Sequence, residues 1–137
     1  MKLSARNQFE GIVENVVEGA VNGIVTVKAG EDTITGTISM AAIKELGLVK
    51  GAKAVAIVKA TEVMVGLGEL KLSARNQLKG TVKHIEKGAV NAIVTIGLPS
   101  GAAVSATISM AAVAELGLTE GSAATAVIKA TSVMIGA

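Results

Sequence analysis

The stretch Lys2-Leu3-Ser4-Ala5-Arg6-Asn7-Gln8 lies near the start of the chain, and residues 71–77 repeat it without a change. Read with the two-residue period of a β-strand, Ser4, Arg6 and Gln8 point to one side of the strand. The pattern therefore predicts a strand face that presents a hydroxyl and a guanidinium. The alternative interpretation is a solvated strand end whose arginine serves solubility.

The repetition extends over nearly the whole chain. The matching segments are residues 3–27 with 72–96 and residues 37–65 with 107–135. A short segment, Gly66-Leu67-Gly68-Glu69-Leu70, joins the two copies. This tandem duplication predicts a first domain at 1–66, a linker at 67–69 and a second domain at 70–137.

Composition favours small, tightly packed β structure. Half of the 137 residues are hydrophobic, yet Phe9 is the only aromatic residue, so a core must be built from Val, Ile, Leu, Ala and Met. Sixteen glycines and a single proline, Pro99, indicate frequent turns rather than long helices or a disordered tail.

Each copy has the pattern of five strands and one short helix. In the first copy the expected strands are 9–17, 21–28, 33–39, 53–59 and 61–65, and the expected helix is 40–46. Ser39 is placed as the N-cap of the helix and Gly47 as its stop signal, and the last two strands could also be one strand bent near Ala60. A helix between the third and fourth of five strands is the OB-fold arrangement, so we expect an all-β chain of two tandem five-stranded OB-fold barrels.

Each repeat is small for an independent domain. A chain of about 60 residues hides only about 60% of the surface that its unfolded form exposes. The scarcity of aromatic side chains adds to this deficit. We therefore expect the two domains to pack against each other and the chain to form a homo-oligomer.

Charge and hydropathy exclude several partners. The net charge is only +2, whereas OB-folds that bind nucleic acid use a basic groove with aromatic stacking platforms, so we expect no nucleic-acid partner. The sequence contains no apolar stretch long enough for a signal sequence or a membrane span. A cytoplasmic protein without a membrane partner is therefore expected.

Catalysis has little support in the sequence. The chain has no Cys, and its only His, His84, corresponds to Asn15 in the first copy. It also lacks a Ser-His-acid set, metal-ligand spacing and a phosphate-binding glycine loop. We therefore expect a protein that is not an enzyme and that uses neither a free metal cation nor a covalent cofactor.

Three polar clusters recur in both copies and contain hydroxyls and cations but no carboxylate. They are Ser4 with Arg6, Thr37 with Ser39, and Lys59 with Thr61, together with their counterparts in the second copy. Groups that donate hydrogen bonds suit a tetrahedral oxyanion. Ser39 and Met40 would add the N-terminus of the short helix, where unpaired N–H groups favour an anion.

Each cluster also has a purely structural interpretation. Ser39 would serve only as a helix cap, Thr37 as a strand residue, and Lys59 as a side chain that reaches water along the barrel rim. Asn22 and Asn91 follow a Gly-Ala-Val turn and are most simply turn or strand-edge residues. The anion hypothesis therefore depends on the three clusters taken together.

Three motifs resemble those of a known family. S-A-R-N-Q at the start of each copy, T-I-S-M before a helix that ends in L-G-L, and K-A-T-x-V-M near the end resemble the Mop domain of the molbindins, which are cytoplasmic molybdate-binding proteins. The resemblance covers nearly the whole chain twice, as in a tandem-Mop (di-Mop) molbindin. It implies an OB-fold in each half, a homotrimer, and oxyanion sites between neighbouring Mop domains.

The resemblance also implies which residues bind the oxyanion. Carried over by motif, they are Ser4, Arg6, Thr37, Ser39, Lys59, Ala60 and Thr61, with Ser73, Arg75, Thr107, Ser109, Lys129, Ala130 and Thr131 in the second copy. Asn22 and Asn91 are candidates for a second type of oxyanion site near a symmetry axis.

The implied function is reversible binding, storage and buffering of molybdate, with tungstate as a close mimic, through hydrogen bonds and the charges of Arg and Lys. A competing hypothesis is a protein-interaction or sensing module that hands molybdate to molybdenum-cofactor enzymes. Nucleic-acid binding is a third hypothesis, which the composition disfavours.

Overall fold

The computed structural model describes residues 2–137, which form two compact units of the same architecture. The first unit contains the residues up to Lys59 together with Lys129–Ala137, and the second contains Ala60–Ile128. Both are built mainly from strands, which confirms the predicted all-β class. No helix in the described range is long and apolar enough to cross a membrane.

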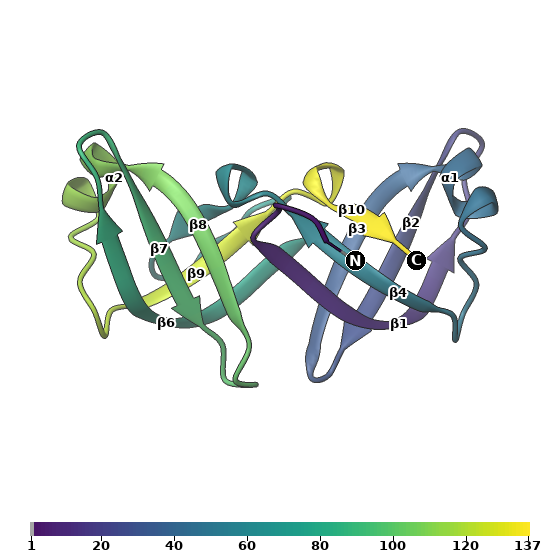
Figure 1. Cartoon of the computed structure of the whole chain (residues 1–137), viewed down its shortest axis with the longest axis horizontal. Helices are drawn as coiled ribbons and strands as arrows, with labels where there is room; N and C mark the ends of the chain where they lie inside the picture. The colour runs from purple at the N-terminus through teal and green to yellow at the C-terminus, as the bar shows by residue number, and fades with distance from the viewer. Residues whose placement is uncertain (1) are drawn as a thin grey trace. The chain divides into compact units, whose positions relative to one another are not determined.

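The first unit contains one five-stranded sheet in the order β10-β4-β1-β2-β3, with every neighbouring pair antiparallel. Its strands are β1 (Asn7–Val17), β2 (Asn22–Ala29), β3 (Asp32–Ser39), β4 (Lys53–Val58) and β10 (Met134–Gly136). The helix α1 (Met40–Glu45) follows β3, and the 3-10 turn η2 (Ala130–Ser132) precedes β10 (Figure 1).

The second unit repeats this design in the order β5-β9-β6-β7-β8. Its strands are β5 (Met64–Gly66), β6 (Asn76–Lys87), β7 (Asn91–Gly97), β8 (Ala103–Ser109) and β9 (Ala123–Ile128). Here the helix α2 (Met110–Glu115) follows β8, and the 3-10 turn η1 (Ala60–Glu62) precedes β5.

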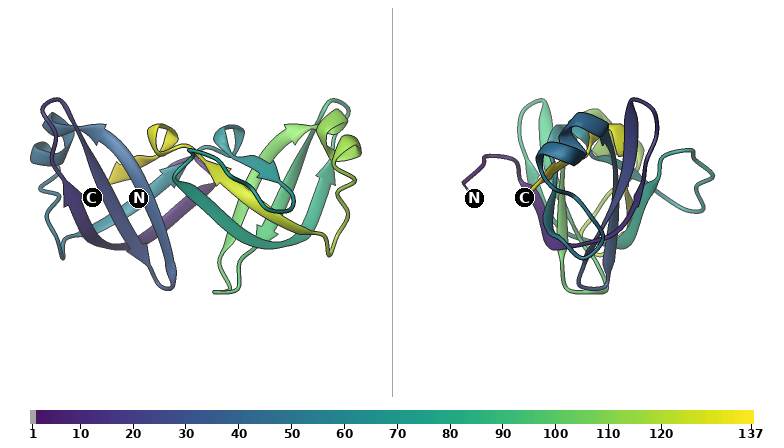
Figure 2. Two further views of the ribbon diagram at one scale, coloured as in Figure 1. Left: turned by 180° about the vertical axis from the view of Figure 1, so that it is seen from behind. Right: turned by 90° about the vertical axis from the view of Figure 1, so that its right-hand side faces the viewer.

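The long strands β1 and β6 are strongly bent (Figure 2). The register of β1 with β2 shifts by one residue between Val13 and Asn15, and β6 shifts against β7 between Val82 and His84. An extra residue in one strand of an antiparallel pair is a β-bulge, which bends the strand and increases its twist. The bend lets β1 pair with β4 through its first half and with β2 through its second half.

The core of each unit is aliphatic and largely β-branched, as the composition predicts. In the first unit Val13, Val25, Val27, Ile34 and Val58 are at most 1% exposed. Branched side chains suit a pleated, buried surface because their restricted rotamers pack well there. Along β2 the residues from Gly23 to Val27 are buried and half-buried in turn, with Val25 and Val27 facing the core.

The ends of α1 are set by local signals that the sequence predicts. The Ser39 hydroxyl oxygen accepts a hydrogen bond of 3.0 Å from the Ala42 N–H, as an N-cap does. At the other end Gly47 has a φ of +63°, and its N–H donates to the Lys44 carbonyl. With the bond from Leu48 N–H to the Ile43 carbonyl, this is a Schellman motif, which ends the helix.

The two repeats exchange their last strands. β10 comes from the second repeat but pairs with β4, so that Ile135 lies opposite Ala56, and β5 comes from the first repeat but pairs with β9, so that Val65 lies opposite Ala126 (Figure 1). The units therefore divide the chain at residues 59/60 and 128/129, not at the 67–69 segment, which lies inside the second unit. The expected last strand, 61–65, is replaced by η1 and the short β5.

Packing on β3 shows how the exchanged segment is accommodated. A Cβ at Gly36 would lie 3.1 Å from Val133 Cγ1 and 3.4 Å from Ile135 Cδ1, so the glycine leaves room for these two side chains. In the second unit the position of Gly36 is taken by Ala106, and the exchanged strand has the shorter Val65 in place of Ile135. The larger Ile135 is thus matched with Gly36, and the smaller Val65 with Ala106.

Candidate functional site

The S-A-R-N segment is not the regular strand that its alternation predicts. β1 begins at Asn7, and the residues from Lys2 to Arg6 lie outside any strand, with Ser4 and Arg6 exposed. The prediction of a common strand face for Ser4, Arg6 and Gln8 is therefore wrong. The reason is that the Gln8 side chain turns back, and its Nε2 donates to the carbonyls of Leu3 at 3.0 Å and Ala5 at 2.9 Å.

The second copy has the same arrangement. Gln77 Nε2 donates to the Leu72 carbonyl at 3.3 Å and to the Ala74 carbonyl at 3.0 Å, and Ser73 and Arg75 are exposed. These glutamines had no role assigned from sequence. The signal that could have identified them is their presence in the repeated heptad, directly after the residues assigned to the site.

The asparagine of the heptad has a structural role that the sequence also left unassigned. Asn7 and Asn76 are only 2% and 3% exposed, although both are polar. Asn76 Nδ2 donates to the Ile128 carbonyl at 3.2 Å, at the end of β9 and directly before Lys129. A buried amide requires such a partner, and this bond fixes the start of β6 against the strand that leads to the K-A-T segment.

The T-I-S segment ends β3 and begins the helix. Thr37 is half-buried in β3 and Ser39 is exposed. In β8, Thr107 is likewise half-buried and Ser109 exposed. The predicted capping role is confirmed for both serines, because Ser109 also accepts a 3.0 Å bond from the Ala112 N–H. A capping hydroxyl accepts through its oxygen, so its own O–H can still donate.

The helix N-terminus offers fewer free donors than the sequence suggests. Met40 N–H donates to the Val21 carbonyl at 2.8 Å, and Met110 N–H donates to the Val90 carbonyl at 2.7 Å. The expectation that Met40 supplies an unpaired N–H to an anion is therefore wrong. The Val21 carbonyl that accepts this hydrogen bond lies in the turn between β1 and β2. A contact between such distant residues cannot be read from a local sequence pattern.

The K-A-T segments follow β4 and β9. Lys59 and Thr61 are exposed and Ala60 is 8% exposed, and Ala130 in the second copy is also 8% exposed. The structure places Lys59 at the surface, as its snorkelling interpretation requires. Each K-A-T segment also marks the point at which the chain passes from one unit to the other.

The strand exchange brings predicted site segments from different repeats into one unit. η2, with Ala130 and Thr131, contacts β3, with Thr37 and Ser39. In the second unit η1 contacts β8 in the same way. The first unit therefore combines the T-I-S segment of the first repeat with the K-A-T segment of the second, and the second unit combines the T-I-S segment of the second repeat with Ala60 and Thr61 of the first.

Most charged and hydroxyl groups of these clusters have no partner within residues 2–137. Within residues 2–137, no ion pair is found for Arg6, Lys59, Arg75 or Lys129. Apart from the caps at Ser39 and Ser109, no hydrogen bond of the described chain engages the hydroxyls assigned to the site. The donors thus remain available to an external ligand.

Asn22 and Asn91 lie at the first positions of β2 and β7. Both are exposed, and each lies opposite a capping serine, Asn22 beside Ser39 and Asn91 beside Ser109. The Gly88 N–H donates to the Asn91 carbonyl at 2.9 Å, in keeping with a strand-edge role. The register places both asparagines next to the T-I-S segments.

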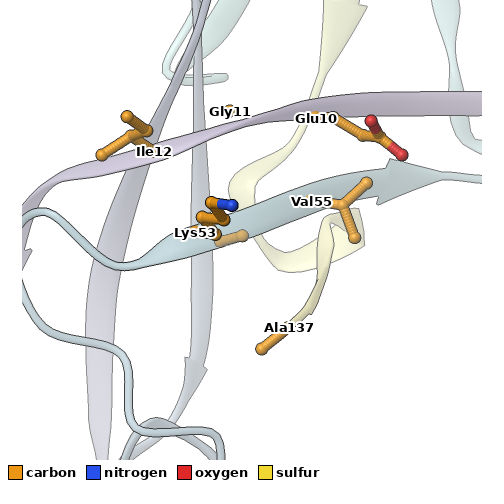
Figure 3. A pocket seen from close by; sticks show the side chains of 7 residues that line it. Glu10, Gly11, Ile12, Lys53, Val55 and Ala137 are labelled. Atoms are coloured by element: carbon orange, nitrogen blue, oxygen red, sulfur yellow. The ribbon is translucent and has the colours of Figure 1, made fainter.

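A hollow of about 550 Å³ on the first unit is lined by different residues (Figure 3). Glu10, Ile12, Lys53, Val55 and Ala137 contribute to its wall. It contains a carboxylate and no hydroxyl side chain, so it does not have the donor-only character that an oxyanion requires. None of the residues assigned to the site from sequence lines this hollow.

Groups of acidic and histidine residues suited to a metal cation are absent from residues 2–137. The chemistry available at the three clusters is therefore that of hydrogen-bond donors and fixed cations. Such a set can bind an anion reversibly.

Comparison with known proteins identifies relatives for both repeats. The TOBE domain model matches residues 3–65 and again residues 72–135. The molybdenum transport protein ModE of Herbaspirillum seropedicae is 41% identical over 138 residues, which cover 98% of this chain and 51% of ModE. A probable molybdenum-pterin-binding protein of Haemophilus influenzae is 60% identical over 67 residues, 49% of this chain and 97% of that protein.

The fold matches a solved structure over its full length. The crystal structure of the cytoplasmic molybdate-binding protein ModG with molybdate bound has a TM-score of 0.96, 45% sequence identity and 99% coverage of both chains. The chain spans about half the length of the ModE relatives that it matches. These findings confirm the resemblance to tandem-Mop molbindins, and the chain belongs to the TOBE domain family, with two copies of the domain in tandem.

Proposed function

We propose that this chain binds molybdate reversibly and without covalent chemistry, as a cytoplasmic store and buffer, with tungstate as a close mimic. The observation that carries the proposal is the set of hydrogen-bond donors on three repeated segments, together with the contact of each 3-10 turn, η2 or η1, with the T-I-S strand of the other repeat. ModG, whose molybdate-bound structure shares 45% of its sequence with this chain, is described as a molybdate-binding protein. No step of this function requires catalysis.

The ligands we propose are the residues of the three clusters, Ser4, Arg6, Thr37, Ser39, Lys59, Ala60 and Thr61, and their counterparts in the second repeat. A dianion that leaves water loses strong solvation, which the protein must replace. Hydrogen bonds to charged groups contribute roughly 1.5–3 kcal/mol each, so several are needed. One arginine and one lysine per site would neutralise the dianion.

We further propose that the sites are completed between domains of a homotrimer. Ser4, Arg6, Ser39 and Lys59 are exposed on the single chain, so none of them yet has the water-free surroundings that strengthen an ionic contact. A neighbouring chain would supply that enclosure. An anion that bridges chains also stabilises the oligomer, because it binds the assembled form and not the free chain.

Calorimetric titration with molybdate, tungstate and sulfate, with the mass measured by light scattering, tests both proposals. We expect saturable heats with molybdate and tungstate and a particle of three chains of 13.6 kDa each. A monodisperse monomer with bound molybdate would contradict the trimer alone. Absence of any molybdate heat would contradict the function.

A substitution at Ser39 and Ser109 separates helix capping from anion binding. Ser→Ala at both positions removes the cap, and we expect a loss of about 1 kcal/mol of stability per helix together with weaker molybdate binding. Ser→Asp keeps a good cap but places a carboxylate where the dianion binds. The Asp variant should therefore unfold close to the wild-type temperature yet fail to bind molybdate. Wild-type affinity in the Asp variant would contradict the placement of both serines in the site.

For Asn22 and Asn91 we propose a second type of oxyanion site, supported by their register beside the capping serines. The proposal predicts that Asn→Ala at both positions lowers the number of anions bound per chain and leaves the affinity of the remaining sites unchanged. The stoichiometry from the same titration measures this.

A further inference from the structure

The first residues of each repeated heptad lie outside regular secondary structure. The residues from Lys2 to Arg6 belong to no strand or helix, and the Gln8 side chain donates hydrogen bonds to two of their carbonyls. The same holds for residues 71–75 and Gln77. In each copy, one glutamine amide thus links two carbonyls of the segment that precedes the strand.

The two carbonyls that Gln8 bonds lie on either side of Ser4, which we propose binds the oxyanion. Gln8 Nε2 donates to Leu3 and Ala5, which bracket Ser4, and Arg6 follows directly. A primary amide has two N–H groups, so one side chain can occupy both carbonyls at once. The bracket thereby restricts the backbone dihedrals of Ser4 and the direction in which Arg6 leaves the segment.

The amide is anchored on a rigid element. Gln8 belongs to β1, where it lies opposite Ile57 of the buried strand β4. Its neighbour Asn7 is only 2% exposed, and the equivalent Asn76 donates to the Ile128 carbonyl at 3.2 Å. The sheet thus anchors the glutamine that bonds residues 3–5, and Gln77 bonds residues 72–74 in the same way.

We infer that Gln8 and Gln77 are positioning residues for the oxyanion, an inference that rests on the proposed function. They do not touch the anion themselves. They order Ser4 and Arg6, or Ser73 and Arg75, before the ligand arrives, so that binding does not have to fix a flexible segment. Ligands that are already ordered bind more tightly because less conformational entropy is lost on binding.

The test replaces both glutamines by methionine, which has a similar length and shape but no N–H group. We expect the affinity for molybdate to fall about tenfold and the amides of residues 3–6 and 72–75 to exchange hydrogen faster in the apo protein. The matched control is Asn15→Leu, which also replaces an exposed amide on β1 but one that holds no segment. This control should bind molybdate as the wild type does.

A double-mutant cycle separates positioning from general damage to the fold. If the glutamines act through the arginines, Gln→Met should cost much less affinity when Arg6 and Arg75 are already alanine. The inference would be overturned if Gln→Met cost the same affinity in both backgrounds, or if the Gln→Met protein bound molybdate with wild-type affinity. In either case the proposed function would stand, provided that the wild-type protein binds molybdate. Failure of the wild type to bind molybdate would overturn the proposed function, and this inference with it.

Discussion

Arg6→Ala combined with Arg75→Ala is expected to weaken molybdate binding about a hundredfold. Each arginine is exposed and free of any ion pair in the described chain, so its guanidinium is available to the dianion. Hydrogen bonds to charged groups contribute roughly 1.5–3 kcal/mol, and the loss of about 3 kcal/mol corresponds to a hundredfold change in Kd. Calorimetric titration of the double variant measures the change.

The matched control for this prediction is Lys2→Ala with Lys71→Ala. These lysines lie in the same repeated heptad and are equally exposed, so the control removes the same net charge from the same segment. A loss of affinity as large as that of the arginine variant would show that overall charge, and not the guanidinium, drives binding. Asn7→Ala would be a poor control, because this side chain is buried and its loss would affect stability.

Gly11→Ala is expected to lower the free energy of unfolding by about 3 kcal/mol. A Cβ at this position would overlap the Lys28 carbonyl oxygen and approach its carbon to 2.6 Å, and these are backbone atoms of the paired strand β2 that cannot rotate away. Overpacking in a well-packed region costs about 1–3 kcal/mol, with the upper end expected where backbone must move. Chemical denaturation of the variant measures the loss.

Gly30→Ala provides the comparison for the glycine prediction. Gly30 has a φ of +63°, but no atom lies within 4 Å of the position of an added Cβ, so the cost is limited to the left-handed backbone. A cost of about 1 kcal/mol is expected for that conformation. If Gly11→Ala and Gly30→Ala lowered the free energy of unfolding equally, the result would contradict the close approach of β1 and β2 at Gly11.

Features encoded by neighbouring residues could be predicted from the sequence. The cap at Ser39 and the stop at Gly47 depend on bonds that span three to five residues, and both were found as expected. The first four strands of each repeat and the aliphatic core follow from runs rich in β-branched residues, as in β2. Local chemistry was therefore sufficient to define the fold class and most of the elements.

The exchange of the last strands could not be predicted in this way. β5 and β10 have almost the same sequence, Met64-Val65-Gly66 and Met134-Ile135-Gly136, so either would pair with β4 by pattern alone. The choice depends on the direction of the chain after the 3-10 turns and on packing such as that of Gly36 against Ile135. These are contacts between distant parts of the sequence.

The candidate site shows the same division. The sequence identified the three polar segments, but it treated the first as a strand because alternation does not reveal a side chain that bonds to its own backbone, as Gln8 does. It also left the Met40 N–H free, whereas the Val21 carbonyl accepts it. Side-chain to backbone bonds and turn contacts decide which groups remain for a ligand.

Anomalous scattering at the tungsten absorption edge can locate tungstate in crystals of this protein and so show whether the three repeated segments form the oxyanion site. We expect tungstate bounded by residues of the three segments, with Arg6 or Arg75 among its contacts and with T-I-S and K-A-T segments from different repeats. Tungstate held elsewhere, for example in the hollow beside Glu10 and Lys53, or its absence from crystals soaked at saturating concentration, would contradict this expectation.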